Sequence, residues 1–301
     1  MKIGIIGGGS LGLLWAARLN EYADVTLFCR TVQQTDVIKK QGLLVTNTSG
    51  QKKRYLVSAE WIEHFHHSAG FDVLFLMVKQ PALDQVLRMI PSLIHQKTHV
   101  VAWQNGLGHV EKIEACHFPA SYAVVTTEGA YKLSANHVQH TGYGYVRLGR
   151  LQSKDGMDSF FSSFLQKFHI ELVDHIEQYL WRKFAVNVVI NPLTALLEVP
   201  NGKLMDLDIQ ATIYQLVNEL CLVADAKGIC LKQADIYDQV SEVCSKTAKN
   251  FSSMLQDIRA GRLTEIDSLN GMVVTYANQC GLVVPTHSTL TDLIRAKSML
   301  F

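Results

Sequence analysis

The chain is short of charge, of clustered cations and of paired cysteines. Charged residues make up 18% of its 301 residues, the formal net charge is +1, and there is no basic tail or run of lysine and arginine. This balance argues against a nucleic-acid partner, because proteins that bind nucleic acids usually present a basic surface to the phosphates. The six cysteines include no C-x-x-C pair, and a chain of this length needs no disulfide staples. We therefore expect a reducing, cytoplasmic compartment.

Long apolar runs are also missing. No run is long enough to cross a bilayer, so we expect no membrane partner. Lys2 and the apolar stretch that follows it to Ala17 resemble a secretory leader. Glycines interrupt that stretch too often for a helical leader, and it continues into Arg18 and a further strand-like segment. With 48% apolar residues, the composition predicts a globular protein with a sizeable core.

A metal site is not indicated. His64, His66 and His67 are clustered, but no cysteine or acidic residue stands at ligand spacing from them. We interpret the cluster as a solvated loop and predict no metal.

The glycines near the start fit a phosphate-binding turn. KIGII is typical of a short strand, SLGLLWAARLNEY is typical of a helix, and a G-x-G-x-x-G motif joins them. Such glycines permit a tight turn and let the backbone approach a pyrophosphate, while the helix start offers N–H donors. In this strand–turn–helix context the motif predicts a dinucleotide held by Gly7, Gly8, Gly9, Ser10, Leu11 and Gly12. The alternative is a glycine-rich turn without a ligand.

The end of the second strand-like segment, ADVTLFCR, distinguishes between dinucleotides. NAD sites usually place Asp or Glu there to hold the ribose 2′-hydroxyl. This chain has Arg30, which suits a 2′-phosphate because guanidinium binds phosphate bidentately. Lys79, after the strand-like FDVLFLMV, is a candidate second cation. We favour NADP(H); the alternative is that both residues are solvated loop charges.

The remaining pattern divides the chain in two. Strand-like and helical runs alternate in the first half, with strand-like runs at 71–78, 98–103 and 120–127 and helical runs at 81–90 and 108–116. NTSG at 47–50 suggests an inserted hairpin. After about residue 170 nearly every segment is helical, broken at VPNG, AKG and QCG. We predict a Rossmann-type, doubly wound parallel α/β domain over 1–170 and an all-α domain over 171–301.

A polar column stands out in the long helix expected at 175–198. Lys183, Asn187 and Asn191 are spaced four apart, so they share one face of an otherwise apolar helix. This predicts a binding site; the alternatives are a lysine at the solvent-exposed edge of the helix and core amides with hydrogen-bond partners.

A further candidate is Asn105, which lies in the glycine-flanked turn of VVAWQNGLG. This turn follows the end of a strand, where α/β sheets bind ligands. The alternative is an ordinary turn, in which Asn and Gly are common.

Two long motifs, RKFAVNVVINPLTALLEVPNG and NFSSMLQDIRAGRLTEIDSLNG, closely resemble those of the ketopantoate reductase family. The resemblance covers essentially the whole chain, including the glycine motif, Arg30, VK at Val78–Lys79, QNG at 104–106 and TTEGA at 126–130. VKQPAL departs from the family's usual run after Lys79, which leaves the second contact to a 2′-phosphate open.

The resemblance implies reduction of 2-dehydropantoate to (R)-pantoate with NADPH, on the route to pantothenate and coenzyme A. It also implies that Lys183 is the catalytic lysine and that Glu265 is a second catalytic residue, which lies near both substrate and nicotinamide. Further cofactor contacts would come from Asn105 and Gly129. The residues implied around the substrate are Asn105, Lys183, Asn187, Asn191, Asn201, Asn250 and Ser253.

The chemistry suits these side chains. Hydride addition to a 2-keto acid creates an alkoxide, which a nearby ammonium stabilises and protonates. A lysine with the ordinary pKa of about 10.4 is charged at neutral pH and available as an acid. Amides and a serine can orient the carboxylate and hydroxyl of the substrate. Glu265 also fits a Thr264–Asp267 capping box, and Asn250 and Ser253 also fit helix caps.

Three functions remain open on the sequence alone. They are NADPH-dependent ketopantoate reductase, a reductase of another small 2-keto acid, and a non-catalytic NADP(H)-sensing regulator. The sequence is compatible with a monomer or a homodimer.

Overall fold

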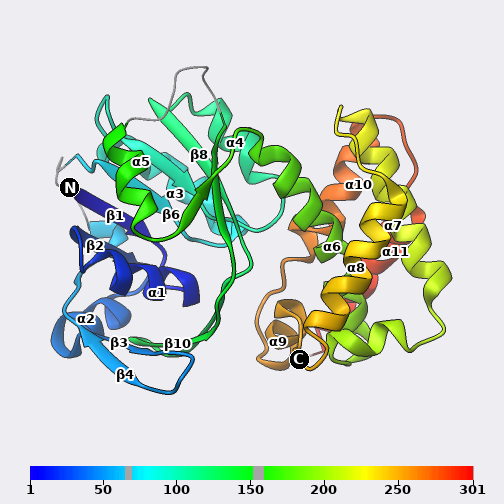
Figure 1. Cartoon of the computed structure of the whole chain (residues 1–301), viewed down its shortest axis with the longest axis horizontal. Coiled ribbons are helices and arrows are strands. Elements are labelled where there is room, and N and C mark those ends of the chain that lie inside the picture. Colours follow the sequence, from blue (N-terminus) through cyan, green and yellow to red (C-terminus); the bar gives the residue numbers. More distant parts are fainter. Residues whose placement is uncertain (65–69, 152–158, 301) are drawn as a thin grey trace. The chain divides into compact units, whose positions relative to one another are not determined.

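The computed structural model describes residues 1–64, 70–151 and 159–300 and divides the chain into two compact units. The first unit comprises Met1–Gln104 and His109–Ile176, and the second comprises Asn105–Gly108 and Glu177–Phe301. Figure 1 shows strands and helices in the first unit and helices in the part of the chain that follows it. The short segment Asn105–Gly108, which follows a strand of the first unit, is thus grouped with the helical unit.

An eight-stranded sheet forms the centre of the first unit. Its strands, in spatial order, are β12 (Ile170–Leu172), β11 (Val146–Arg150), β8 (Ala120–Thr126), β7 (His99–Ala102), β6 (Val73–Leu76), β1 (Lys2–Ile6), β2 (Asp24–Cys29) and β5 (Ser58–Trp61). All neighbouring pairs are parallel except β8 with β11. The order reverses direction at β1, as in doubly wound sheets that bind dinucleotides. The predicted fold class is confirmed.

Both faces of this sheet are buried. The helices of the unit are α1 (Ser10–Leu19), α2 (Val32–Gln41), α3 (Leu83–Met89), α4 (His109–Ala115) and α5 (Ser159–Gln166), with single 3₁₀ turns η1 (Ile62–His64), η2 (Gln80–Ala82) and η3 (Ile90–Ser92). Ile3 and Ile5 of β1 pack into one apolar core with α1, whereas Ile6 packs into another with α3. Successive strand residues point to opposite faces, so an almost continuously apolar strand indicates helices on both sides.

A second sheet has four strands: β4 (Lys52–Tyr55), β3 (Leu43–Thr46), β10 (His137–Gly142) and β9 (Gly129–Ser134). β3 and β4 are antiparallel, and in the turn between them Asn47 Oδ1 accepts from the backbone N–H of Ser49 and of Gln51. This confirms the predicted hairpin. β9 and β10 were not predicted, because β9 buries none of its side chains fully and so lacks an apolar pattern.

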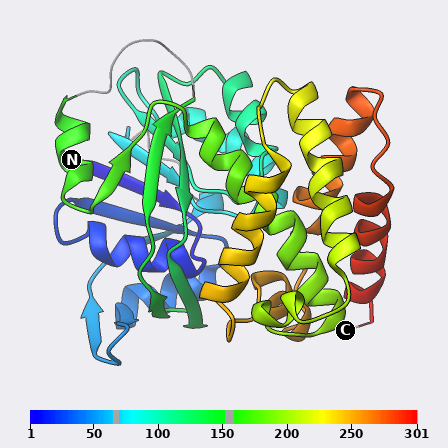
Figure 2. The same cartoon turned by 45° about the vertical axis from the view of Figure 1, so that its right-hand side comes forward.

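The second unit is helical, as predicted. Its elements are α6 (Ile176–Leu197), η4 (Asn201–Met205), α7 (Gln210–Ala226), α8 (Gln233–Lys246), α9 (Ser253–Arg259), η5 (Ile266–Ser268), α10 (Asn270–Gln279) and α11 (Pro285–Ser298). Figure 2 shows the same succession of helices from green to red. VPNG, AKG and QCG lie at the ends of α6, α7 and α10. Within the described ranges, no helix has both the length and the apolarity to cross a membrane.

Buried polar contacts fix α6 within this unit. The Asn270 side chain of α10 donates to the Val188 carbonyl of α6 over 2.9 Å and lies 3.0 Å from Nδ1 of His287 in α11. Burial lowers the pKa of His287 to about 4, so this ring is neutral near pH 7. Glu219 of α7 accepts from the backbone N–H groups of Thr286 and His287 and thereby satisfies the start of α11. Buried hydrogen bonds therefore tie α6 to α10, and α10 to α11.

Candidate active site

The glycine turn between β1 and α1 has the shape that a pyrophosphate requires. Gly7 has φ of +124°, and a Cβ on it would lie 2.6 Å from the Met77 carbonyl oxygen. A Cβ on Gly12 would collide with the Gly7 carbonyl. A Cβ on Gly9, by contrast, would meet nothing within 4 Å. Gly7 and Gly12 are thus needed for the turn itself, whereas Gly9 borders open space, so the turn fits a dinucleotide.

Contacts from distant residues hold this turn. Gly9 is the N-cap of α1, which no side chain caps. The Gly8 carbonyl accepts from Gln34 Nε2 at 2.9 Å and from Lys132 Nζ at 2.9 Å. Ser10 Oγ accepts from the backbone N–H of Lys132. Sequence reasoning missed Gln34 and Lys132, because Lys132 lies 124 residues from Gly8 and no local pattern links the two.

The end of β2 carries the charge that the sequence indicated. Arg30 follows the last residue of β2, is exposed, and accepts from Trp61 Nε1 through its carbonyl at 3.2 Å. Burial raises the pKa of the preceding Cys29 thiol to about 11, so that group is neutral. Lys79 is exposed at the N-cap of η2. Arg30 therefore offers a cation where NAD sites usually have a carboxylate.

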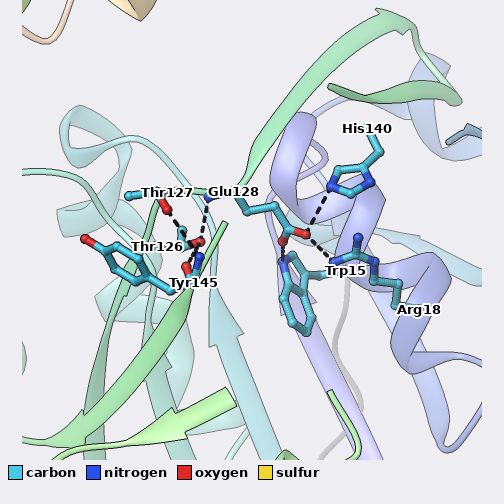
Figure 3. A network of polar contacts seen from close by, with 7 residues as sticks. All are labelled: Trp15, Arg18, Thr126, Thr127, Glu128, His140 and Tyr145. Carbon is cyan, nitrogen blue, oxygen red and sulfur yellow. Dashed lines mark hydrogen bonds and ion pairs between the residues drawn. The ribbon is translucent and has the colours of Figure 1, made fainter. Parts of the chain in front are cut away.

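The TTEGA segment is fixed by a buried carboxylate. Glu128, whose side chain is 3% exposed, accepts from Trp15 Nε1 at 2.9 Å and pairs with Arg18 at 2.5 Å. His140 Nε2 lies 3.3 Å from the same carboxylate, and Figure 3 shows these groups converging on it. A Cβ on Gly129 would lie 2.6 Å from Thr141 Oγ1. Tight strand packing accounts for this glycine, and its contact with a cofactor stays a prediction.

The hydroxyls of the same segment fix its backbone (Figure 3). Thr126 Oγ1 accepts from the backbone N–H of Glu128 and donates to the Tyr145 carbonyl at 2.9 Å. Thr127 Oγ1 accepts from the Tyr145 N–H. The motif thus carries a structural network, which links β8 to α1.

Lys183 forms a hydrogen bond with Asn105 within the helical unit. Lys183 Nζ donates to Asn105 Oδ1 over 2.8 Å, although the two residues are 78 apart in sequence. Burial lowers the pKa of Lys183 to about 8, and the charge of Glu265 opposes that shift. The expectation of an ordinary pKa near 10.4 is wrong, because α6 packs this ammonium into a partly desolvated position. The structure thus places two of the predicted residues, Asn105 and Glu265, where they act on the amine of Lys183.

Asn187 and Asn191 follow Lys183 on α6, and both are partly buried. Within the described part of the chain, neither side-chain amide has a hydrogen bond to another residue. A satisfied core amide would have protein partners. The polar column is therefore available to a ligand.

Asn201, Asn250 and Ser253 lie on neighbouring segments of the same unit. The Asn201 N–H donates to the Asn250 carbonyl at 2.9 Å, and the Asn201 side chain donates to Thr247 Oγ1. Thr194 Oγ1 of α6 donates to Ser252 Oγ at 2.7 Å, beside Ser253. The loop after α6 thus packs on the segment between α8 and α9, and these contacts order three predicted substrate residues.

The capping alternatives are not found. The cap of α9 is Ser252, whose hydroxyl accepts from the Leu255 N–H, so neither Asn250 nor Ser253 serves as its cap. Glu265 precedes η5, and no side chain caps that turn. The capping box at Thr264–Asp267 is therefore wrong, and Glu265 exerts an electrostatic influence on Lys183.

Metal ligands are not clustered in residues 1–64, 70–151 and 159–300, where no group of three or more His, Cys, Asp or Glu side chains could hold an ion. His66 and His67 of the predicted loop lie outside the described residues.

The chain matches one family in both units. Residues 3–153 match the family described as ketopantoate reductase PanE/ApbA, and residues 175–298 match ketopantoate reductase PanE/ApbA C terminal. The 2-dehydropantoate 2-reductase of Vibrio cholerae is 31% identical over 300 residues, 98% of this chain and 97% of the relative. That of Bacillus subtilis is 34% identical over 286 residues, 94% and 92% of the two chains.

Solved structures extend the similarity to folds. The ternary structure of D-mandelate dehydrogenase with NADH and anilino(oxo)acetate has a TM-score of 0.92 at 27% identity, covering 100% of this chain and 99% of that one. A probable 2-dehydropantoate 2-reductase from Bacillus subtilis has a TM-score of 0.85 at 31% identity, covering 99% and 100%. The similarity spans both units.

Proposed function

The chain belongs to the ketopantoate reductase family, and from this premise we propose that it reduces 2-dehydropantoate to (R)-pantoate with NADPH, on the route to pantothenate and coenzyme A. Membership makes it an oxidoreductase that uses a nicotinamide dinucleotide. The observation that carries the proposal is the 2.8 Å hydrogen bond from Lys183 Nζ to Asn105 Oδ1, at a position where burial also lowers the pKa of Lys183. Perturbed amines of this kind are typical of active sites.

The first unit binds the dinucleotide in this proposal. The glycine turn holds the pyrophosphate and Arg30 binds the 2′-phosphate. Bound nicotinamide supplies the hydride for the keto carbon. Lys79, Gly129, Asn105 and Glu265 are proposed as further contacts on the basis of the family.

The second unit binds the keto acid and provides the proton. As C2 is reduced, the Lys183 ammonium stabilises the developing alkoxide and donates a proton to it, leaving a neutral amine that solvent reprotonates. A pKa of about 8 keeps most of this amine protonated at pH 7 and makes it a stronger acid than an ordinary lysine. Asn105 fixes the ammonium, and the amides of Asn187 and Asn191 orient the substrate oxygens.

A reductase of another 2-keto acid is the second candidate. The similarity to D-mandelate dehydrogenase over the whole chain supports it, since that enzyme forms a complex with NADH and anilino(oxo)acetate. A non-catalytic sensor is disfavoured, because a sensor has no need for a half-buried lysine with a lowered pKa.

An assay of cofactor oxidation separates these functions. The purified protein is mixed with NADPH and either 2-dehydropantoate, pyruvate or phenylglyoxylate, and loss of NADPH absorbance is followed. We expect the highest kcat/KM with 2-dehydropantoate. A higher value with phenylglyoxylate would support the second candidate. Tight NADPH binding without turnover of any keto acid would contradict both enzymatic proposals.

Arg30→Ala is expected to weaken NADPH binding far more than NADH binding, because only NADPH carries the 2′-phosphate. A charge-assisted contact contributes roughly 1.5–3 kcal/mol, or about ten- to a hundredfold in Kd. Both cofactors are titrated against both proteins by nucleotide fluorescence. An equal loss of affinity for the two would mean that Arg30 does not bind the phosphate.

A further inference from the structure

Two cations of the first unit flank the glycine turn, since the Gly7 N–H donates over 3.0 Å to the carbonyl of Phe28, two residues before Arg30. Arg30 follows β2, and Lys132 lies on β9, which runs past the turn so that Lys132 Nζ is 2.9 Å from the Gly8 carbonyl oxygen. The backbone N–H of Lys132 donates to Ser10 Oγ over 3.1 Å. Lys132 is thus held by the phosphate-binding turn at two points, one from its backbone and one from its side chain.

The pair lacks a counter-ion of its own. Neither Arg30 nor Lys132 forms an ion pair within the described ranges of the chain, and Lys132 is only partly exposed. Burial lowers the pKa of Lys132, the neighbouring Cys29 opposes that shift, and the positive charge of Arg30 adds to it. The neighbouring thiol of Cys29, with a pKa of about 11, is neutral at pH 7 and does not compensate.

Two like charges, one of them partly desolvated at Lys132, repel each other and destabilise the unliganded protein. An anion between them reverses this effect, because each cation then gains a charge-assisted contact. Arg30 is exposed and Lys132 is partly buried. The guanidinium of Arg30 offers two parallel N–H donors, and the ammonium of Lys132 offers a compact charge to the same ligand. A phosphate monoester, with its several acceptor oxygens and a charge near −2, matches that pair of donors.

We propose that Lys132 also binds the 2′-phosphate of NADPH, together with Arg30, and that this pair contributes to the preference for NADPH over NADH whether or not Lys79 makes a further contact. This proposal rests on the proposed NADPH-dependent function and deepens it. It assigns to β9 a role in cofactor selectivity that sequence patterns did not indicate. Lys132 acts in this role through its Nζ, while its backbone keeps β9 beside the turn.

The test measures cofactor binding without any keto acid, so that it does not depend on turnover. Parent, Lys132→Met and Lys132→Arg proteins are titrated with NADPH and with NADH by nucleotide fluorescence. Lys97→Met, which changes an exposed lysine of the same unit, is the matched control. A parent protein that bound NADH as tightly as NADPH would contradict the proposed cofactor itself, and with it this inference.

We expect Lys132→Met to weaken NADPH about tenfold or more and to change NADH binding much less. Lys132→Arg should recover most of the NADPH affinity, and Lys97→Met should leave both affinities unchanged. The contrary result is that the parent prefers NADPH but Lys132→Met weakens both cofactors equally. Lys132 would then act only by supporting the turn, and the inference would be overturned.

A double variant tests whether the two cations share one phosphate. If they do, the combined loss of NADPH affinity in Arg30→Ala/Lys132→Met differs from the sum of the single losses in free energy. Additive losses would show that the two cations act independently and would overturn the shared site.

Discussion

Lys183→Met is expected to lower kcat by about 10² or more while leaving NADPH affinity nearly unchanged, which is the usual scale for the loss of a general acid. Methionine approximates the shape of the lysine side chain but carries no proton to donate. The glycine turn and Arg30, which are proposed to bind NADPH, belong to the other unit. Steady-state rates with 2-dehydropantoate and a fluorescence titration of NADPH measure the two effects.

The same variant should be more stable than the parent near pH 7. The folded-state pKa of Lys183, about 8, lies below the ordinary value of 10.5, so burial of the charged form costs the fold up to roughly 3 kcal/mol below pH 8. The unfolded chain binds the extra proton between pH 8 and 10.5, so the parent regains stability as pH rises through that window. The advantage of Lys183→Met should therefore shrink as pH rises from 8 to 10.5.

Lys246→Met is the control for both effects, because Lys246 lies on α8 in the same unit and its side chain is 71% exposed. It should change neither kcat nor stability appreciably. A Lys183→Met protein that turned over at the parent rate would remove Lys183 from the mechanism, and one that was much less stable would show that Lys183 contributes to the fold.

Glu128→Ala should destabilise the first unit by about 3–5 kcal/mol. The carboxylate is 3% exposed, and its removal leaves the Arg18 guanidinium and the Trp15 N–H without their acceptor. The Arg18 side chain is 28% exposed, and a partly buried charge without its partner costs more than the lost attraction itself. Urea unfolding, followed by tryptophan fluorescence, measures the change as a lower midpoint with an unchanged slope.

Glu171→Ala is the matched control, since Glu171 pairs with Arg147 in the same unit but is 53% exposed. Exposed ion pairs contribute about 0–1 kcal/mol, so this variant should unfold close to the parent. Equal destabilisation by the two substitutions would mean that the contribution of Glu128 to the free energy of unfolding does not depend on its burial.

Short sequence patterns were enough to predict the features that depend on neighbouring residues. The glycine motif, the apolar strands, the NTSG hairpin and the breaks between helices each depend on residues close together in sequence. The helix predicted at 175–198 is observed at Ile176–Leu197, and its polar column follows from the helical period alone. Arg30 was identifiable because its strand ends at a position with a known chemical role.

Contacts across long sequence separations were not predictable in the same way. The ordinary pKa assumed for Lys183 was wrong, since desolvation depends on how α6 packs, which one sequence does not reveal. Lys132 was missed because β9 has little apolar pattern and reaches the turn only in the folded chain. The capping box at Thr264 matched in sequence, but the turn that follows is capped by no side chain.

The pH dependence of kcat/KM for 2-dehydropantoate, at saturating NADPH, tests most directly whether Lys183 provides the proton. Activity should be constant where the ammonium is protonated and should fall about tenfold per pH unit above a pKa of about 8. The residual activity of Lys183→Met should lack this alkaline limb. A parent profile that stayed flat from about pH 7 to 10, or an alkaline limb that persisted in Lys183→Met, would contradict the assignment of Lys183 as the proton donor.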